Sequence, residues 1–189
     1  MDNILKSKKI AILVADGFEQ VELVEPRQAL LDAGAKVHIV SPAADTVQGW
    51  NHYDKADRFS VDVELNQANP QDYDGLLLPG GTVNPDQLRV NGNAVKFVKA
   101  FRTANKPIAA ICHGPWTLIE ADIVEGCKVT SWPSLQTDLK NAGADWIDQT
   151  VVVDAGLITS RNPDDIPAFN REIIKAFARD TGKVPLQTA

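Results

Sequence analysis

A cysteine and a histidine stand side by side where an apolar run gives way to glycine and proline. Cys112 and His113 lie in the segment PIAAICHGPW, residues 107–116. The run predicts a buried strand over residues 106–112, and Pro115 suits the first turn of a following helix. A side chain at such a strand-to-helix turn is exposed. The free N–H groups of a helix start favour thiolate over thiol, so we expect a lowered pKa for Cys112.

Two other strand ends carry groups that suit a thiol nucleophile. Glu19 follows an expected strand at residues 8–15, and Gly80 and Gly81 end another at residues 74–81. Carboxyl ends of parallel strands meet at one edge of a sheet, where ligands bind. There a carboxylate moves protons, and glycine N–H groups hold an oxyanion. Each feature alone also fits a cap, a turn or a core position, but together they favour a site.

The second cysteine and the cofactor patterns point away from this edge. Cys127 begins an expected strand at residues 127–132 and so lies at the opposite end of the sheet, which favours a structural role. Two cysteines make a poor disulfide framework, and we expect both as thiols. No zinc-ligand spacing and no G-x-G-x-x-G motif occurs in the sequence, so we expect neither a metal nor an organic cofactor.

Apolar periodicity predicts strands and helices in alternation along the chain. Besides those above, strands are expected at residues 35–41, in a hairpin-like excursion at 46–65, and as a pair at 149–160. Helices are expected at residues 18–33, 93–104, 114–124, 134–143 and 162–180. This order favours an α/β fold, a doubly wound, mostly parallel sheet sandwiched by helices.

Particular residues define the expected buried faces of the first and last helices. In the first helix, Asp16 is the expected N-cap, and Glu19 is placed to complete a capping box. The apolar residues expected to share a face there are Phe18, Val21, Val24 and Leu31. Those expected on one face of the last helix are Ile166, Phe169, Ile173 and Phe177.

Length and charge limit the class of protein. The 189 residues suit a single domain, 1–189, in which residues 1–8 form a polar tail. The net charge is -6 without clustered Lys and Arg, so we expect no nucleic-acid partner. No apolar run approaches the ~20 residues of a membrane span, and the start lacks signal-peptide features, so we expect no membrane association and a cytoplasmic location.

Three motifs together carry a family resemblance. AICHGP, LLLPGG and DGFEQVEL resemble the PfpI family of the ThiJ/PfpI superfamily, and the likeness extends from about Lys9 to Phe177. That superfamily includes the human Parkinson-disease-linked deglycase and has a flavodoxin-like, class I glutamine amidotransferase-like fold. Within it, the chain is similar to bacterial general stress proteins and to the intracellular protease I group.

The resemblance implies roles for the residues at the strand ends. Cys112 matches the nucleophile, Glu19 the acid that contacts the thiol, and His113 the histidine after the nucleophile. Gly80 and Gly81 match the oxyanion-hole turn.

Two further positions depart from the family pattern. In peptidase-like members an acid from a neighbouring subunit orients the histidine, and that position is Asp86 here, where those members have Glu. Trp116, an expected substrate-binding residue, stands where relatives have Gln, and residues 51–60 resemble an insertion at the pocket mouth. Adjacent elbow residues usually project apart, which argues against contact of His113 with the sulfur without a partner subunit.

The family implies several activities. The first is protection from stress by acting on reactive dicarbonyls such as methylglyoxal or on early protein glycation adducts. The alternatives are a cysteine peptidase acting on peptides and a non-enzymatic redox sensor or chaperone in which Cys112 is oxidised. A homo-oligomer is expected in each case. A glutamine amidotransferase needs a His-x-Glu late in the chain, which the three histidines His38, His52 and His113 do not supply.

Overall fold

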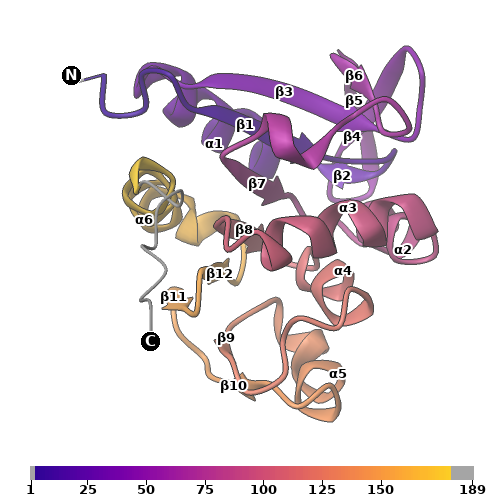
Figure 1. The fold of residues 1–189 in the computed structure, drawn as a ribbon. Helices are drawn as coiled ribbons and strands as arrows, with labels where there is room; N and C mark the ends of the chain where they lie inside the picture. The colour runs from indigo at the N-terminus through magenta and orange to yellow at the C-terminus, as the bar shows by residue number, and fades with distance from the viewer. Residues whose placement is uncertain (1–2, 180–189) are drawn as a thin grey trace.

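Seven strands form the central sheet of the computed structural model, which describes residues 3–179 (Figure 1). Across the sheet they are β11 (Val151–Asp154), β12 (Leu157–Ser160), β8 (Ile108–Ile111), β7 (Gly75–Leu78), β1 (Lys9–Leu13), β3 (Lys36–Ser41) and β6 (Val63–Glu64). All neighbouring pairs are parallel except β11 with β12. The predicted mostly parallel sheet is confirmed.

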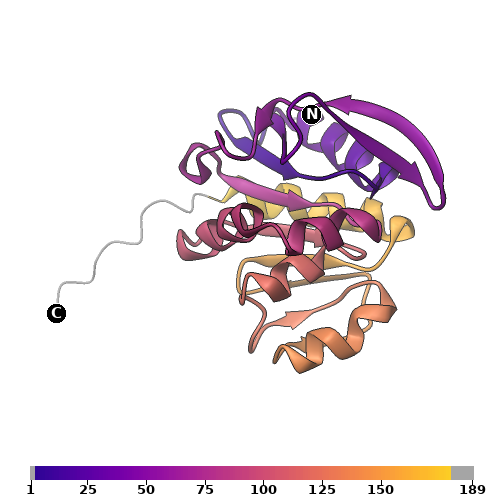
Figure 2. The same cartoon turned by 90° about the vertical axis from the view of Figure 1, so that its right-hand side faces the viewer.

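Helices cover both faces of the sheet, as Figures 1 and 2 show. The α-helices are α1 (Gln20–Asp32), α2 (Val83–Arg89), α3 (Gly92–Thr103), α4 (Pro115–Glu120), α5 (Gln136–Asn141) and α6 (Ile166–Ala178). The 3-10 helices are η1 (Pro70–Asp72), η2 (Pro133–Leu135) and η3 (Pro163–Asp165). The helices α1 and α6 pack on one face, while α3 and α4 pack on the other. The predicted sandwich is therefore confirmed.

Alternation along the strands separates two apolar cores. In β1, Ile10 and Ile12 pack on the side of α6, where Phe169 lies, and Ala11 faces the other core, which contains Phe101 of α3. Successive strand side chains point to opposite faces, so a strand buried on both sides is apolar throughout. This explains the continuous apolar runs that identified the central strands.

Short strands form two small additional sheets. Their bounds are β2 (Phe18–Glu19), β4 (Thr46–Asn51), β5 (Asp54–Ser60), β9 (Lys128–Val129) and β10 (Asp145–Trp146). The strands β4 and β5 form the hairpin expected within residues 46–65, and β4 also pairs with β2. The helix α2 and strand β10 were not predicted, because a seven-residue polar helix and a two-residue strand show too little periodicity.

The buried face of α1 differs from the expected one. Val24 and Leu31 are 40% and 38% exposed, and Asp16 accepts a hydrogen bond from the Gln48 N–H instead of capping the helix. The residues that α1 buries are Glu22, Leu23, Pro26 and Leu30. An acid and a proline on this face break the apolar pattern. In α6, by contrast, all four residues of the expected face are 0% exposed.

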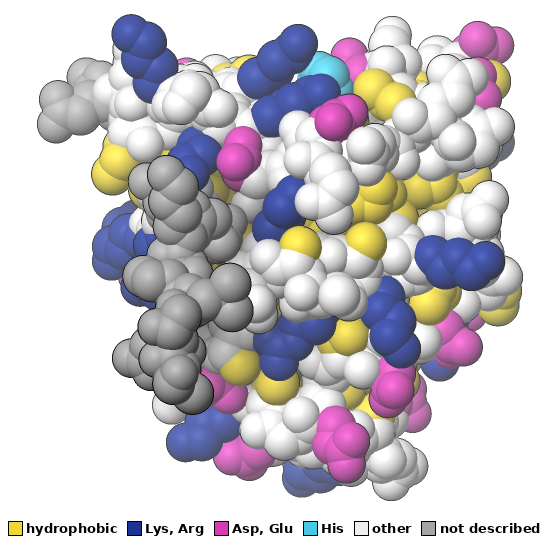
Figure 3. All heavy atoms as spheres, in the orientation of Figure 1, with side chains coloured by type: hydrophobic (Ala, Val, Ile, Leu, Met, Phe, Trp, Pro, Cys, Tyr) yellow, Lys and Arg dark blue, Asp and Glu magenta, His cyan; other side chains and the backbone are white. Residues whose placement is uncertain are grey.

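Part of the expected polar tail packs against the domain. Leu5 is fully buried, and its N–H donates to the Ala33 carbonyl at 2.9 Å. The expectations for residues 1, 2 and 180 lie outside the described residues. Within residues 3–179 no helix is long and apolar enough to span a bilayer. On the face in Figure 3, Lys and Arg side chains are spread among acidic and uncharged ones.

Candidate active site

The candidate site lies where the strand order of the sheet reverses. Strand β1 pairs with both β3 and β7, and the chain reaches β3 through α1 before returning to β7 on the other side. Ligands of open α/β sheets bind beside the carboxyl ends of strands at such a point. A pocket of about 540 Å³ opens there. It is lined by Gly17, Glu19, Glu22, Trp50, His52, Tyr53, Gly81, Thr82, Val83, Cys112, His113, Trp132 and Pro163.

Cys112 occupies a strained turn directly after β8. Its φ of 61° lies in the left-handed region, which non-glycine residues seldom adopt. Two backbone hydrogen bonds hold this conformation: the Cys112 N–H donates to the Ser160 carbonyl at 3.0 Å, and its carbonyl accepts from the Trp132 N–H at 2.9 Å. The geometry matches the expected elbow, but the side chain is only 6% exposed.

The glycine pair after β7 allows the backbone to approach Cys112 closely. A Cβ on Gly80 would lie 2.6 Å from the Cys112 Cβ and 2.7 Å from Glu22 Oε2. The Gly80 N–H donates to Glu22 Oε2 at 2.7 Å, so it is not free for the oxyanion role expected of it. The N–H groups of Gly81 and His113 hydrogen-bond the Cys112 side chain. Of the pair, Gly81 is therefore the donor that faces the sulfur.

Glu22, rather than Glu19, is the acid that contacts the thiol. Glu22 is 0% exposed, and its side chain interacts with that of Cys112. One helical turn places residue 22 on the inner face of α1, whereas Glu19 precedes the helix. Sequence reasoning missed Glu22 because apolar periodicity assigns acids to the solvent side.

Glu22 and Cys112 repel each other when both are ionised. Burial raises the pKa of Glu22 to about 8, so its carboxyl keeps a proton at pH 7. Burial and the charge of Glu22 raise the pKa of Cys112, while the Gly81 and His113 N–H groups lower it. The expected net lowering of the Cys112 pKa is therefore wrong: the sulfur is deeper, and closer to an acid, than a helix start alone indicates.

Glu19 lies on the pocket wall and holds the β4–β5 hairpin. Its Oε2 accepts a hydrogen bond from the His52 N–H at 3.1 Å, and His52 Nδ1 lies 3.9 Å from the same oxygen. Trp50 and Tyr53 of the hairpin also line the pocket. Of residues 51–60, His52 and Tyr53 thus line the pocket.

His113 reaches the sulfur within one chain. Its Nδ1 lies 3.1 Å from Cys112 Sγ, so the expectation that a partner subunit must bring them together is wrong. The positive φ of Cys112 turns the two adjacent side chains toward each other. The ring stacks on Trp132 at 5.8 Å between centroids, and Nε2 lies 3.4 Å from Ser134 Oγ. Burial lowers the pKa of His113, which favours a neutral imidazole.

Asp86 and Trp116 do not line the pocket. Asp86 is exposed in the first turn of α2. Trp116 packs edge-on against His113 at 5.2 Å between centroids, and its indole N–H donates to Asp138 Oδ2 at 2.9 Å. Trp116 therefore contacts His113 outside the pocket lining, and its substrate-binding role stays a prediction. Trp132, which sequence reasoning placed only in a strand, is the tryptophan beside His113 that lines the pocket.

Asn84 connects the two loops that flank the crevice. The side chain is 0% exposed, and its Oδ1 accepts from the Ala15 N–H at 2.7 Å. Its Nδ2 donates to the carbonyls of Pro79 and Gly80 at 2.9 and 3.1 Å. A buried amide with all these partners fixes the loop after β1 relative to the glycine turn. No periodic pattern in the sequence singled it out.

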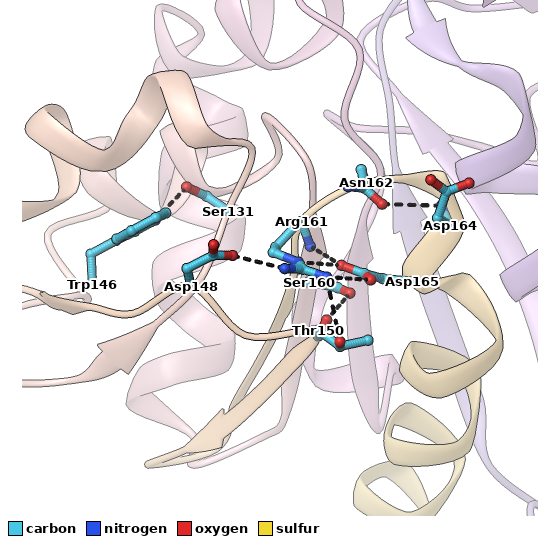
Figure 4. Close-up of polar contacts among 9 residues, drawn as sticks. All are labelled: Ser131, Trp146, Asp148, Thr150, Ser160, Arg161, Asn162, Asp164 and Asp165. Carbon is cyan, nitrogen blue, oxygen red and sulfur yellow. Dashed lines mark hydrogen bonds and ion pairs between the residues drawn. The ribbon is translucent and has the colours of Figure 1, made fainter.

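Arg161 links η3 to the segment that precedes the strand pair β11–β12 (Figure 4). Its Nε donates to Asp165 Oδ2 at 2.8 Å, and its Nη1 donates to Asp148 Oδ1 at 2.8 Å. These hydrogen bonds raise the pKa of Arg161. The network holds the chain before β11 against η3, where Pro163 lines the pocket.

Cys127 lies outside the candidate site. Cys127 is 3% exposed and lies 3.5 Å from Arg102 Nη2, outside the pocket lining. Its environment agrees with the expected structural role. Within residues 3–179, no three or more His, Cys, Asp and Glu side chains are arranged to hold a metal ion.

Comparison with known proteins identifies the family of the chain. Residues 8–176 match the DJ-1/PfpI family. The chain belongs to this family. It is 45% identical over 167 residues to General stress protein 18 of Bacillus subtilis, covering 87% of this chain and 95% of the relative. Protein/nucleic acid deglycase 2 of Escherichia coli is 44% identical over 171 residues, covering 89% and 97%. The DJ-1beta structure from Drosophila melanogaster aligns with a TM-score of 0.82 at 28% identity over 91% of each chain. The expected family is confirmed.

Proposed function

We propose that this DJ-1/PfpI protein is a stress-protection enzyme that converts reactive dicarbonyls, or their early adducts on amines, to hydroxy acids. The observation that carries the proposal is the contact of Cys112 with Glu22, a buried carboxyl whose pKa is raised to about 8. An acid that titrates near the working pH transfers protons efficiently in both directions. The deglycase name of the 44% identical relative supports the same chemistry.

Attack of Cys112 begins the proposed reaction. The Cys112 thiol gives its proton to the neutral His113 at Nδ1, 3.1 Å away. The Sγ–C bond forms at the aldehyde carbon of methylglyoxal as the C=O π bond breaks, and the carbonyl oxygen takes the proton of Glu22, which gives a hemithioacetal. With an amine adduct, Sγ displaces the amine from the same carbon, and the amine leaves with a proton. The N–H groups of Gly81 and His113 hydrogen-bond the Cys112 side chain and lower the pKa of the thiol, against the larger raising effect of burial.

An internal proton shift then completes the conversion. The ionised Glu22 takes the proton from the former aldehyde carbon and returns it to the neighbouring ketone carbon, while the hydroxyl proton passes from the first oxygen to the second. The first carbon is oxidised and the second reduced within one molecule, so no external oxidant is needed. Water hydrolyses the resulting thioester, which breaks the C–S bond and releases lactate and the Cys112 thiol. The net reaction consumes one water.

A matched pair of cysteine variants tests the proposal. We expect lactate formation from methylglyoxal, and from its adduct with N-acetyllysine, to fall by at least 100-fold in Cys112→Ala. Cys127→Ala, which removes the other buried thiol, keeps the wild-type rate. Lactate would be measured with a stereospecific dehydrogenase assay for each enantiomer. Equal rates in wild type and Cys112→Ala would overturn the proposal.

A cysteine peptidase is the second candidate. The observation that favours it is the 3.1 Å contact between His113 Nδ1 and Cys112 Sγ, which is the pairing that activates a thiol nucleophile. A fluorogenic peptide assayed beside methylglyoxal with the same proteins separates the two functions. Peptide cleavage that requires both Cys112 and His113, without lactate formation, would favour the peptidase.

A further inference from the structure

The pocket is larger than a free dicarbonyl requires, and much of its wall is aromatic. Its volume of about 540 Å³ lies in the range of about 300–1,000 Å³ that accommodates drug-sized ligands. Trp50, His52 and Tyr53 contribute rings from the β4–β5 hairpin, and Trp132 contributes one from the loop after β9. Tyr53 is 92% exposed, so its ring is available at the mouth. Such a wall suits a planar group attached to the reacting carbon.

The pocket lining contains two carboxyl groups, and its only basic side chains among the described residues are the imidazoles of His52 and His113. Glu19 accepts the His52 N–H on Oε2, while its Oε1 accepts no hydrogen bond from the described residues. Glu22 keeps its proton at pH 7 because burial raises its pKa to about 8. Among the described residues, no Lys or Arg lines the pocket. Arg161, near Pro163, already donates to two aspartates.

Within the function proposed above, we propose that Glu19 and the hairpin rings form a subsite for a planar cation, so that adducts carried by arginine are preferred to adducts carried by nucleotides. A guanidinium stacks on aromatic faces and pairs with a carboxylate, and its early adduct keeps the positive charge. A nucleotide also presents a planar ring, but its phosphate meets the Glu19 carboxylate without a lining Lys or Arg to offset the repulsion. The net charge of -6 acts in the same direction.

Binding without turnover tests the subsite directly. Calorimetric titration of Cys112→Ala with N-acetylarginine amide and with guanosine monophosphate gives the two affinities. We expect arginine amide to bind at least tenfold more tightly, and Glu19→Gln in the same background to reduce that ratio to below threefold. Glu25→Gln, the same change at an exposed position of α1, keeps the ratio. Equal or tighter binding of the nucleotide, or an unchanged ratio in Glu19→Gln, would overturn the subsite.

Turnover separates this inference from the proposed function. With methylglyoxal adducts of the same two carriers, we expect wild type to show at least a tenfold higher kcat/KM for the arginine adduct, and Glu19→Gln to lose most of that preference. If neither adduct is converted while the binding preference holds, the proposed function fails and the cation subsite stands. If both adducts are converted at equal kcat/KM, the cation subsite fails and the proposed function stands.

Discussion

Glu19 and Glu22 lie three residues apart, and their different surroundings give them different roles in the site. Glu22 is enclosed between α1 and the glycine turn, whereas the side chain of Glu19 is 13% exposed on the pocket wall. Burial keeps Glu22 neutral at pH 7, so it stands ready as a proton donor beside the thiol. Two acids with separated roles of this kind are typical of acid–base sites. The difference arises because Glu22 lies on the inner face of α1, whereas Glu19 precedes the helix.

Replacement of Glu22 is expected to change the reactivity of Cys112 in a defined order. Below pH 8 the carboxyl is neutral, so its repulsion of the thiolate is absent and its hydrogen-bond donor remains. Glu22→Leu removes the donor, and we expect slower alkylation of Cys112 below pH 8. Glu22→Gln keeps a donor and is expected to lie between wild type and Glu22→Leu. Rates of iodoacetamide alkylation from pH 5 to 8 measure the difference. Faster alkylation in Glu22→Leu would show that Glu22 is ionised.

Glu22 is also expected to make the protein less stable as pH rises. Its pKa is raised from 4.5 to about 8 on folding, so the folded state holds a proton that the unfolded state loses. The free energy of unfolding therefore falls between about pH 4.5 and pH 8, by roughly a few kcal/mol. Urea denaturation at pH 5 and pH 8.5 measures the decline. It should be smaller in Glu22→Gln and unchanged in Glu25→Gln; an equal decline in Glu22→Gln would contradict the assignment.

At the scale of elements, Asn84 of α2 holds the loops after β1 and β7 at a fixed separation. Asn84→Ala leaves the Ala15 N–H and the Pro79 and Gly80 carbonyls without their partner, which costs roughly 1–3 kcal/mol. Because Gly81 follows directly, we expect kcat to fall at least tenfold and the alkylation pKa of Cys112 to rise. Asn93→Ala, at an exposed position of α3, is the control. Lower stability with an unchanged alkylation profile would limit Asn84 to a structural role.

The elements also show which features of the site could be predicted from the sequence. The strand ends were predictable because apolar runs stop at glycine, and the elbow because Cys112 precedes His113-Gly114. The role of Glu22 was not predictable, because apolar periodicity does not detect a single buried acid. The pKa of the thiol depends on how deeply Cys112 is buried beneath the glycine turn. That depth follows from packing between distant segments, which local sequence does not encode.

For the whole molecule, a homo-oligomer stays a prediction. The ring nitrogen of His113 that faces away from sulfur lies near Ser134 Oγ, and no described acid contacts it. Exposed Asp86 on α2 is the expected source of such an acid in a second chain. We expect light scattering to give a multiple of 20.5 kDa, and Asp86→Asn to lower any peptidase rate while sparing lactate formation. A monomer at micromolar concentration would remove this role for Asp86.

A cytoplasmic location likewise stays a prediction from the sequence. It can be measured by fractionating cells that express the full chain. Recovery in a membrane or extracellular fraction would contradict it.

The hydrogen bond from the Cys112 N–H to the Ser160 carbonyl has a consequence for folding during synthesis on the ribosome. Ser160 ends β12, so nearly the whole chain must leave the ribosome before the elbow gains this partner. Contacts of such sequence separation form late, after the local helices. A nascent chain therefore carries an unorganised thiol, and the chemistry begins only when synthesis is almost finished.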